Sequence, residues 1–324
     1  MLRFWLVFVT VLIFFSLPVL AHHGGASISQ GEGTPIETNS PLTLPQGSTV
    51  VFTRFEYAPF RKFEFADPYN TDSFRFYQLG ASYGLTDFLT GTLILPYNAK
   101  SQDGHGTFRG FGDAKLLLNA GLNWEPGVGL NFNDEDDVAI DIGETNKWYF
   151  GLYGGLTAPT GRDDIDIGLG VDGGLQPGFG SPTFTLGASL TKPLSQTFSL
   201  TADTSVEIFT EKDGGDKFGN EFRANLAGVW NMHVDPESTL SQIDGVLELN
   251  YLRLSRDETA GVSELGTGGG ILYAGPGVRA QVGDVNLGAL VKFPLAKSLN
   301  ERPLQQGSEG LEKYRLVLTA STAF

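Results

Sequence analysis

The sequence predicts an all-β fold, an up-and-down antiparallel β-barrel of about twelve strands that crosses a membrane. Apolar and polar residues alternate with a period of two in many segments of about ten residues, the length that a tilted strand needs to span a bilayer. The chain is also rich in glycine and aromatic residues, with 43 Gly, 24 Phe, 10 Tyr and 4 Trp in 324 residues. Such a composition favours short strands joined by tight turns over a helical enzyme. The last alternating segment ends on Phe324 itself.

The first twenty-one residues are typical of a secretory signal peptide. Arg3 precedes a long apolar run, and Ala21 supplies the small residue of a cleavage site. A retained membrane anchor is the alternative, but Pro18 interrupts the run near its end and no basic flank follows it. We therefore expect a signal peptide, a periplasmic leader and a membrane barrel at residues 1–21, 22–47 and 48–324.

Twelve segments show the alternation. In residues 197–209, for example, Phe198 and Leu200 share one face, while Thr201 and Asp203 share the other. An even number of strands is expected because both termini of a single-chain barrel stay on the periplasmic side. The expected strands cover approximately residues 48–58, 72–84, 88–98, 112–124, 146–159, 182–192, 196–210, 218–232, 243–256, 270–283, 284–295 and 312–324.

The lengths of the connections agree with this topology, because barrels of this kind have short periplasmic turns and longer external loops. The tightest connections all follow even-numbered strands, at residues 85–87, 193–196 and 283–284. The long connections, rich in Gly and Asp, follow odd-numbered strands, at residues 59–71, 101–111, 159–181, 256–269 and 297–311. One exception is the long acidic stretch 125–145, which the topology places in the periplasm. A hairpin in this stretch would raise the number of strands to fourteen.

The C-terminal segment carries the most specific signal. Tyr314, Leu316, Leu318 and Phe324 share one face of the last expected strand. This pattern resembles the last strand of outer-membrane barrels, in which the assembly machinery reads an aromatic terminal residue. We therefore expect the bacterial cell outer membrane as the location, Phe324 as the assembly signal, and membrane lipids and the barrel assembly machinery as partners.

Charged residues of the expected strands fall on the polar face. A Lys or Arg that faces lipid at mid-bilayer costs about 2–4 kcal/mol, so this face should line the lumen. The side chains expected there are Arg54, Glu56, Lys115, Asp203, Glu207, Glu221, Arg223, Glu248, Arg279, Lys292 and Arg315. Two interpretations remain open: a network of ion pairs that plugs a narrow lumen, or a pathway lined with paired charges through which small solutes pass.

Composition excludes several functions. The formal net charge of -15 argues against nucleic acid as a partner, since phosphates bind Lys and Arg. The absence of cysteine excludes disulfides, thiolate metal clusters and a catalytic thiol.

Two apparent catalytic motifs fit the barrel better than an enzyme. Residues 80–84 match the Gly-X-Ser-X-Gly nucleophile elbow, but a turn and another expected strand follow them instead of a helix. Residues 168–173 match a dinucleotide fingerprint, but Pro177 prevents the helix that such a site needs. The stronger enzyme alternative is an outer-membrane phospholipase with a Ser-His pair. His105 and His233 are the only histidines in the body of the mature chain, and neither has a serine in the expected strand context, so we expect no catalytic residues.

No cofactor is expected, with one alternative at the new N-terminus. Cleavage after Ala21 would place a free amine beside His22 and His23, and these nitrogens suit Cu²⁺ or Zn²⁺. A polar, disordered leader without metal is the favoured interpretation. The acidic stretches 134–137 and 163–166 lack the ligand order of a calcium loop, which favours solvated loops.

Short motifs at strand ends and turns carry a family resemblance that spans most of the mature chain. They are His22–Gly25, Pro35–Thr38, Thr43–Pro45, Arg54–Tyr57, Gly110–Lys115 and Ala158–Gly161. On these motifs the chain resembles the transporter-like family labelled after the meta-pathway of phenol degradation. The resemblance implies an outer-membrane barrel for passive uptake or passage of small solutes, aromatic or hydrophobic ones among them. Besides the phospholipase, a closed structural or adhesin-like barrel remains an alternative.

Overall fold

The computed structural model describes residues 33–62, 70–134, 137, 145–165, 173–212, 214–265, 267–300 and 312–324. Within these residues the fold is a single antiparallel barrel, and its only helix is the short 3₁₀ turn η1 (Gly173–Leu175). The barrel strands are β1 (Thr49–Pro59), β2 (Thr71–Thr86), β3 (Leu89–Gln102), β5 (Lys115–Glu125), β7 (Trp148–Thr157), β8 (Thr183–Ser195), β9 (Phe198–Phe209), β10 (Glu221–Val234), β11 (Leu240–Leu254), β14 (Gly269–Val282), β15 (Val285–Leu299) and β16 (Arg315–Ala323). In the described part of the chain, no helix has the length and apolarity needed to cross a membrane.

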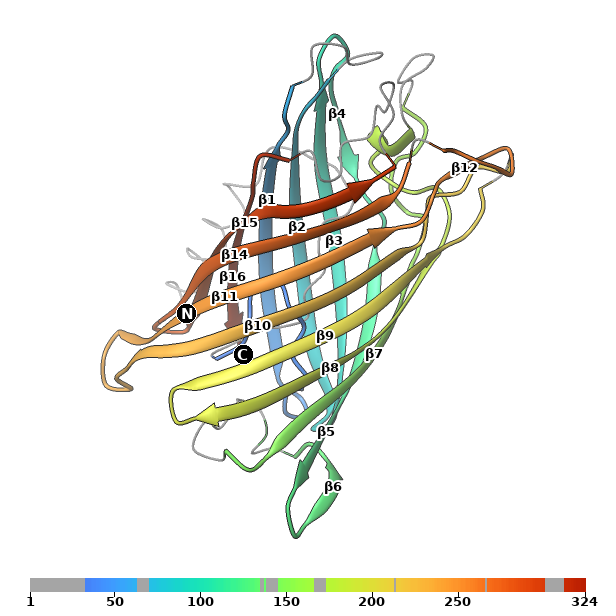
Figure 1. The fold of residues 1–324 in the computed structure, drawn as a ribbon. Coiled ribbons are helices and arrows are strands. Elements are labelled where there is room, and N and C mark those ends of the chain that lie inside the picture. Colours follow the sequence, from blue (N-terminus) through green and yellow to red (C-terminus); the bar gives the residue numbers. More distant parts are fainter. Residues whose placement is uncertain are drawn as a thin grey trace, which may run out of the picture.

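The barrel closes through its first and last strands. Strand β1 pairs with β16 from Val50 opposite Ala323 to Tyr57 opposite Leu316, and every other barrel strand pairs with its neighbours along the chain (Figure 1). Closure leaves no open edge along the sheet, which a membrane requires because lipid offers no hydrogen bonds. The predicted all-β barrel of twelve strands is therefore confirmed, and the predicted boundaries lie within a few residues of the observed ones.

Shorter strands lie at the two ends of the barrel. Strand β4 (Gly106–Phe111) pairs with the end of β3, and β12 (Glu258–Thr259) pairs with β13 (Val262–Ser263) in a long loop. Strand β6 (Gly129–Phe132) forms a hairpin with the end of β5 and projects from the opposite end (Figure 1). Because β5 pairs directly with β7, this hairpin adds no strand to the barrel, and the fourteen-strand alternative is wrong.

The alternation of side chains follows the barrel wall. Apolar side chains such as Leu79, Leu152 and Leu186 are more than half exposed, as expected for side chains that face lipid. Polar and charged side chains on the opposite face, such as Glu56 and Thr201, are fully buried inside the barrel. The short connections, such as those between β2 and β3 and between β14 and β15, lie at the end from which β6 projects, so that end is periplasmic.

Candidate functional site: the plugged lumen

Residues 33–43, here called the N-terminal plug, lie inside the barrel. From Thr34 to Pro41 every residue is buried. The sequence predicted a periplasmic leader over residues 22–47 that merely reaches the first strand. Residues 33–43 depart from that expectation, because inward-facing polar side chains of many strands provide the hydrogen bonds that this segment lacks on its own. Residues 22–32, including His22 and His23, lie outside the described residues.

A single carboxylate holds the centre of the N-terminal plug. Glu248 on β11 is fully buried, and its Oε1 accepts hydrogen bonds from the backbone amides of Ile36 at 2.7 Å and Glu37 at 2.9 Å. Its Oε2 accepts from both the amide of Thr38, at 2.8 Å, and the hydroxyl of that residue, at 2.6 Å. Hydrogen bonds to a charged acceptor contribute about 1.5–3 kcal/mol each. Glu248 is therefore the main anchor of the plug.

A second carboxylate holds the next residue of the plug. Asp203 on β9 accepts a hydrogen bond from the Asn39 amide at 3.0 Å and another from the Asn39 side chain at 3.3 Å. The hydroxyl of Tyr153 on β7 donates to the same carboxylate at 2.8 Å, as does the Asn225 side chain on β10. Asp203 thus ties the plug to β9 and, through Tyr153 and Asn225, to β7 and β10.

The plug also contributes a charge of its own. Glu37 forms ion pairs with Arg54 on β1 and, at 2.9 Å, with Lys292 on β15. Arg54 also forms an ion pair with Glu56 at 2.7 Å, and Glu56 forms another with Arg315 on β16 at 3.2 Å. Arg315 then pairs with Glu312 at 2.5 Å. We call these six side chains the inner network: Glu37, Arg54, Glu56, Lys292, Glu312 and Arg315.

Apolar contacts, and glycines that leave space where a side chain would be, complete the site that holds the plug. Ile36 is buried against Val229, Val246, Leu290 and Val317, which face inward from four strands. A Cβ at Gly151 would lie 2.8 Å from Cα of Pro41. Glycine at that position therefore leaves room for the plug.

Two more glycines leave room for the segment that precedes β1, one beside the plug and one beside Pro45. A Cβ at Gly277 would lie 3.0 Å from Cδ1 of Ile36, and one at Gly84 would lie 2.0 Å from the carbonyl oxygen of Pro45. The high glycine content thus serves the interior as well as the turns.

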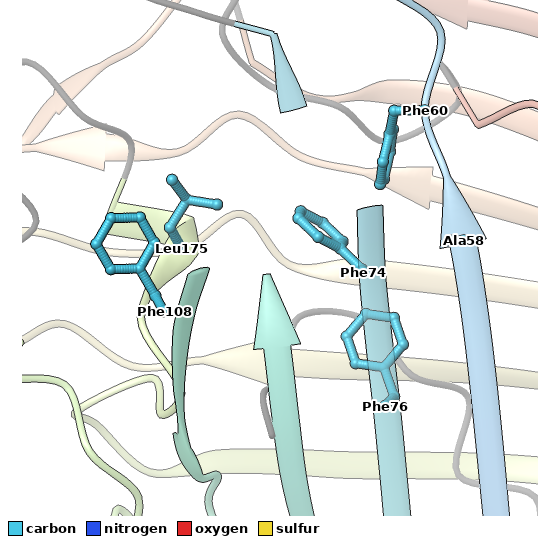
Figure 2. Packing of buried hydrophobic residues seen from close by; sticks show 6 residues of the cluster. All are labelled: Ala58, Phe60, Phe74, Phe76, Phe108 and Leu175. Atoms are coloured by element: carbon cyan, nitrogen blue, oxygen red, sulfur yellow. The ribbon is translucent and has the colours of Figure 1, made fainter. Parts of the chain in front are cut away.

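Aromatic side chains occupy the external end of the lumen. Figure 2 shows this mouth cluster: Ala58, Phe60, Phe74, Phe76, Phe108 and Leu175. The rings of Phe60 and Phe74 lie 4.7 Å apart and those of Phe74 and Phe76 lie 5.9 Å apart, both with edge-to-face geometry. Leu175 belongs to η1, in the external loop between β7 and β8, and packs beside Phe108 (Figure 2). The described part of this loop therefore packs against the other side chains of the mouth cluster.

Polar contacts fix this loop, and residues 173–178 are called the mouth loop below. Lys100 on β3 is fully buried and donates hydrogen bonds to the carbonyls of Gly174 and, at 3.3 Å, Gln176. Asp113 accepts from the amides of Gly161 and Phe179. This arrangement could not be predicted from the sequence, because strand periodicity identifies neither Lys100 nor the mouth loop.

The structure places all eleven predicted lumen residues on the inner face. Seven of them contact the plug directly or belong to the inner network: Arg54, Glu56, Asp203, Glu248, Arg279, Lys292 and Arg315. Arg279 does so by donating to the carbonyl of Pro35. The other four form two separate pairs, Lys115 with Glu207 at 2.9 Å and Arg223 with Glu221 at 2.6 Å.

The family model described as "Putative MetA-pathway of phenol degradation" matches residues 68–297, which is most of the chain. The chain belongs to this family. The predicted resemblance is confirmed, and the match covers the barrel from before β2 to near the end of β15. Among curated proteins, none matches the chain significantly.

This member of the phenol-degradation family is also similar to solved outer-membrane barrels. A COG4313 outer-membrane channel from Pseudomonas putida F1 is 17% identical, with a TM-score of 0.61, and the alignment covers 92% of this chain and 100% of that chain. The NanC porin is 8% identical, with a TM-score of 0.46 and coverage of 84% and 98%. The β domain of the Bordetella autotransporter BrkA is 14% identical, with a TM-score of 0.43 and coverage of 86% and 100%. The Pseudomonas likeness shows the fold, so the family member is an outer-membrane barrel whose apolar outer face contacts lipid.

The remaining sequence motifs also have a place in this barrel. Ser82 of the apparent nucleophile elbow lies inside β2 with its hydroxyl 2.8 Å from that of Thr92, so the strand interpretation is confirmed. Of the apparent dinucleotide fingerprint only Gly173 is described, and it begins η1. Of the acidic stretch 134–137, Asp137 pairs with Lys147. The described part of the chain holds no group of three or more His, Asp or Glu side chains suited to a metal ion.

Proposed function

We propose that this chain is a gated outer-membrane channel for passive passage of small aromatic or hydrophobic solutes. The mouth cluster is the observation that carries the proposal. Most inward-facing residues of the barrel are polar, yet four phenylalanines gather on the lumen side at its external end. Apolar side chains with few polar groups are the usual lining of sites for apolar ligands. The cluster therefore supplies a first binding site for a solute that arrives from outside.

Passage requires two displacements. The aliphatic side chain of Leu175 fills the space beside Phe108. Once the mouth loop moves, an apolar solute can occupy this space and make the same kind of apolar contact. Below it the N-terminal plug crosses the lumen and must also leave its seat. The structure thus represents the closed state of the proposed channel.

Uptake of a hydrophobic dye by cells tests the proposal. Cells that produce the chain should take up N-phenyl-1-naphthylamine faster than cells without it, and Phe74→Asp should abolish the difference because it places a charge in the apolar site. Leu186→Ala, a change on the lipid face, is the matched control and should leave uptake unchanged. Equal uptake by producing and non-producing cells would contradict the proposal, provided that the heat-dependent gel shift shows a folded barrel.

A closed structural barrel is the second candidate, and the extent of the plug contacts favours it. This candidate predicts that neither dye uptake nor ion conductance appears under any condition, even when the plug is removed. Catalysis has no part in either candidate. We further propose that Phe324 serves as the assembly signal, since its side chain is 73% exposed while its backbone pairs with Thr49 in the closing strand pair.

A further inference from the structure

The charges of the inner network balance only when the plug is in place. Without the plug, the network holds three cations, Arg54, Lys292 and Arg315, and two carboxylates, Glu56 and Glu312. Glu37 supplies the third carboxylate. All of these side chains are buried. Removal of one partner from a buried ion pair is strongly unfavourable, so withdrawal of Glu37 demands a replacement anion.

Aromatic rings border the same cations. The ammonium of Lys292 lies 5.3 Å from the ring centre of Tyr273, and the guanidinium of Arg315 lies 5.7 Å from the ring centre of Phe76. Phe76 is also a member of the mouth cluster, so the apolar mouth cluster and the charged inner network are in contact. A ligand with a ring and a carboxylate separated by a short distance matches both parts.

We propose that Arg54 and Lys292 form an internal carboxylate site, occupied in this structure by Glu37, that binds the carboxylate of a small aromatic acid when the plug withdraws. The proposal rests on the proposed channel function and narrows its solute class. A neutral solute leaves the excess cation unbalanced, whereas an aromatic acid restores neutrality and places its ring near Phe76 and Tyr273. Ligand binding thereby stabilises the open state in preference to the closed one.

Chemical rescue in detergent tests the site without any transport step. Glu37→Ala removes the tethered carboxylate and should lower the Tm of the refolded barrel, measured by loss of the β signal in circular dichroism. Sodium benzoate should raise the Tm of this variant by about 2–4 °C at saturation. Benzyl alcohol, and sodium chloride at equal ionic strength, should not raise it, and the wild type should respond little because Glu37 occupies the site.

Two further variants separate this site from general weakening of the plug. Asn39→Ala removes the side-chain hydrogen bonds of Asn39 to Asp203 and Tyr153 and leaves the cations paired, so benzoate should not rescue it. Glu37→Ala combined with Lys292→Met should lose the rescue, because the excess cation is gone. Equal responses of Glu37→Ala and Asn39→Ala to benzoate would overturn the proposal, as would equal effects of benzoate and benzyl alcohol on Glu37→Ala.

Glu37→Gln keeps the side-chain size and replaces Glu37→Ala if the latter does not refold, with the same expected order of responses. The result is independent of dye uptake. Rescue by benzoate in a protein that carries no dye would refute the proposed function and leave the carboxylate site, whereas dye uptake without rescue would refute the site alone.

Discussion

Residues 33–43 and residues 173–178 both fold into the lumen, the first from the periplasmic end and the second from the external end. The N-terminal plug is held by charged groups: Glu248, Asp203 and Arg279 bind its backbone, and Arg54 and Lys292 bind Glu37. The mouth loop instead inserts Leu175 among phenylalanines, with Lys100 as its main polar contact.

The two closures differ in what can displace them. Apolar packing is non-directional and accepts any apolar group of suitable size, so a solute can take the place of Leu175. Buried charges accept only a partner of opposite charge, so the plug leaves under narrower conditions. On the proposed function, the mouth therefore selects solutes by apolarity, and the middle of the lumen selects them by charge.

Among the variants that test this comparison, Glu248→Ala should have the largest effect, which is a loss of docking of the plug. This change removes the acceptor of the four hydrogen bonds that the plug donates to Glu248 and should weaken docking of the plug by about 3–5 kcal/mol. Because the chain has no cysteine, the thiol introduced by Ser40→Cys is a clean reporter, buried in the closed state. Maleimide labelling of this thiol should accelerate at least a hundredfold in the Glu248→Ala background.

Glu207→Ala is the control for the loss of a lumen carboxylate. Its described partners are Lys115, Thr157 and Thr183, none of which belongs to the plug. Labelling at position 40 should therefore stay slow. Equal acceleration by both variants would mean that the plug responds to overall charge and that Glu248 is no specific anchor.

At the mouth, Leu175→Ala should weaken docking of the loop by about 2–3 kcal/mol, through loss of apolar contact and the space left behind. The thiol introduced by Pro177→Cys, at a buried position of the same loop, reports the opening. Its labelling should accelerate while labelling at position 40 stays unchanged. If both reporters respond to Leu175→Ala, the two closures are one cooperative unit and the distinction drawn above is wrong.

A smaller effect is expected from Gly151→Ala, which keeps every charge and adds one methyl group close to both Pro41 and the hydroxyl of Ser189. Overpacking of this kind costs about 1–3 kcal/mol, so labelling at position 40 should rise moderately. Gly154→Ala on the same strand is the matched control, since its added Cβ would lie 3.5 Å from the carbonyl oxygen of Thr185, an ordinary van der Waals contact. Indistinguishable labelling in the two variants would show that the plug does not need the space at Gly151.

The smallest effect belongs to Lys62, which bridges Asp72 and Asp103 at the external rim with 41% of its side chain exposed. Partial burial acts to lower the pKa of Lys62, but hydrogen bonds to Asp103 and Asp72 outweigh it and raise the pKa. A raised lysine pKa stabilises the fold below the usual lysine range, and this contribution is lost only as the pH rises through the raised value. Lys62→Met should therefore change the unfolding free energy by less than about 1 kcal/mol, equally at neutral and mildly alkaline pH, and a larger loss in chemical unfolding would contradict this.

Strand periodicity was sufficient to predict the barrel because each strand must present opposite faces to lipid and to the interior. The inward positions of Glu248 and Arg54 followed from the same rule. The partners of these residues did not, since the plug has no periodicity and its contacts span more than two hundred positions of sequence. Pro35, Ile36 and Glu37 carried no sign that they would lie inside the barrel.

The mouth cluster could not be predicted from the sequence for a different reason. Phe74 and Phe76 lie on the inner face of β2, where the alternation rule expects polar residues. Such a break in the pattern was the available signal. Leu175 could not be assigned at all, because it lies in a glycine-rich loop whose path depends on Lys100.

Planar-bilayer recording of the mature chain beside a variant that lacks residues 33–43 tests the gated channel most directly. The full chain should show small or rare conductance, because the plug crosses the lumen. The deletion variant should conduct readily, because Glu248, Asp203 and Arg279 no longer hold a segment across the lumen. Equal conductance of the two proteins, or none in either while both show the gel shift of a folded barrel, would contradict the plug as the gate.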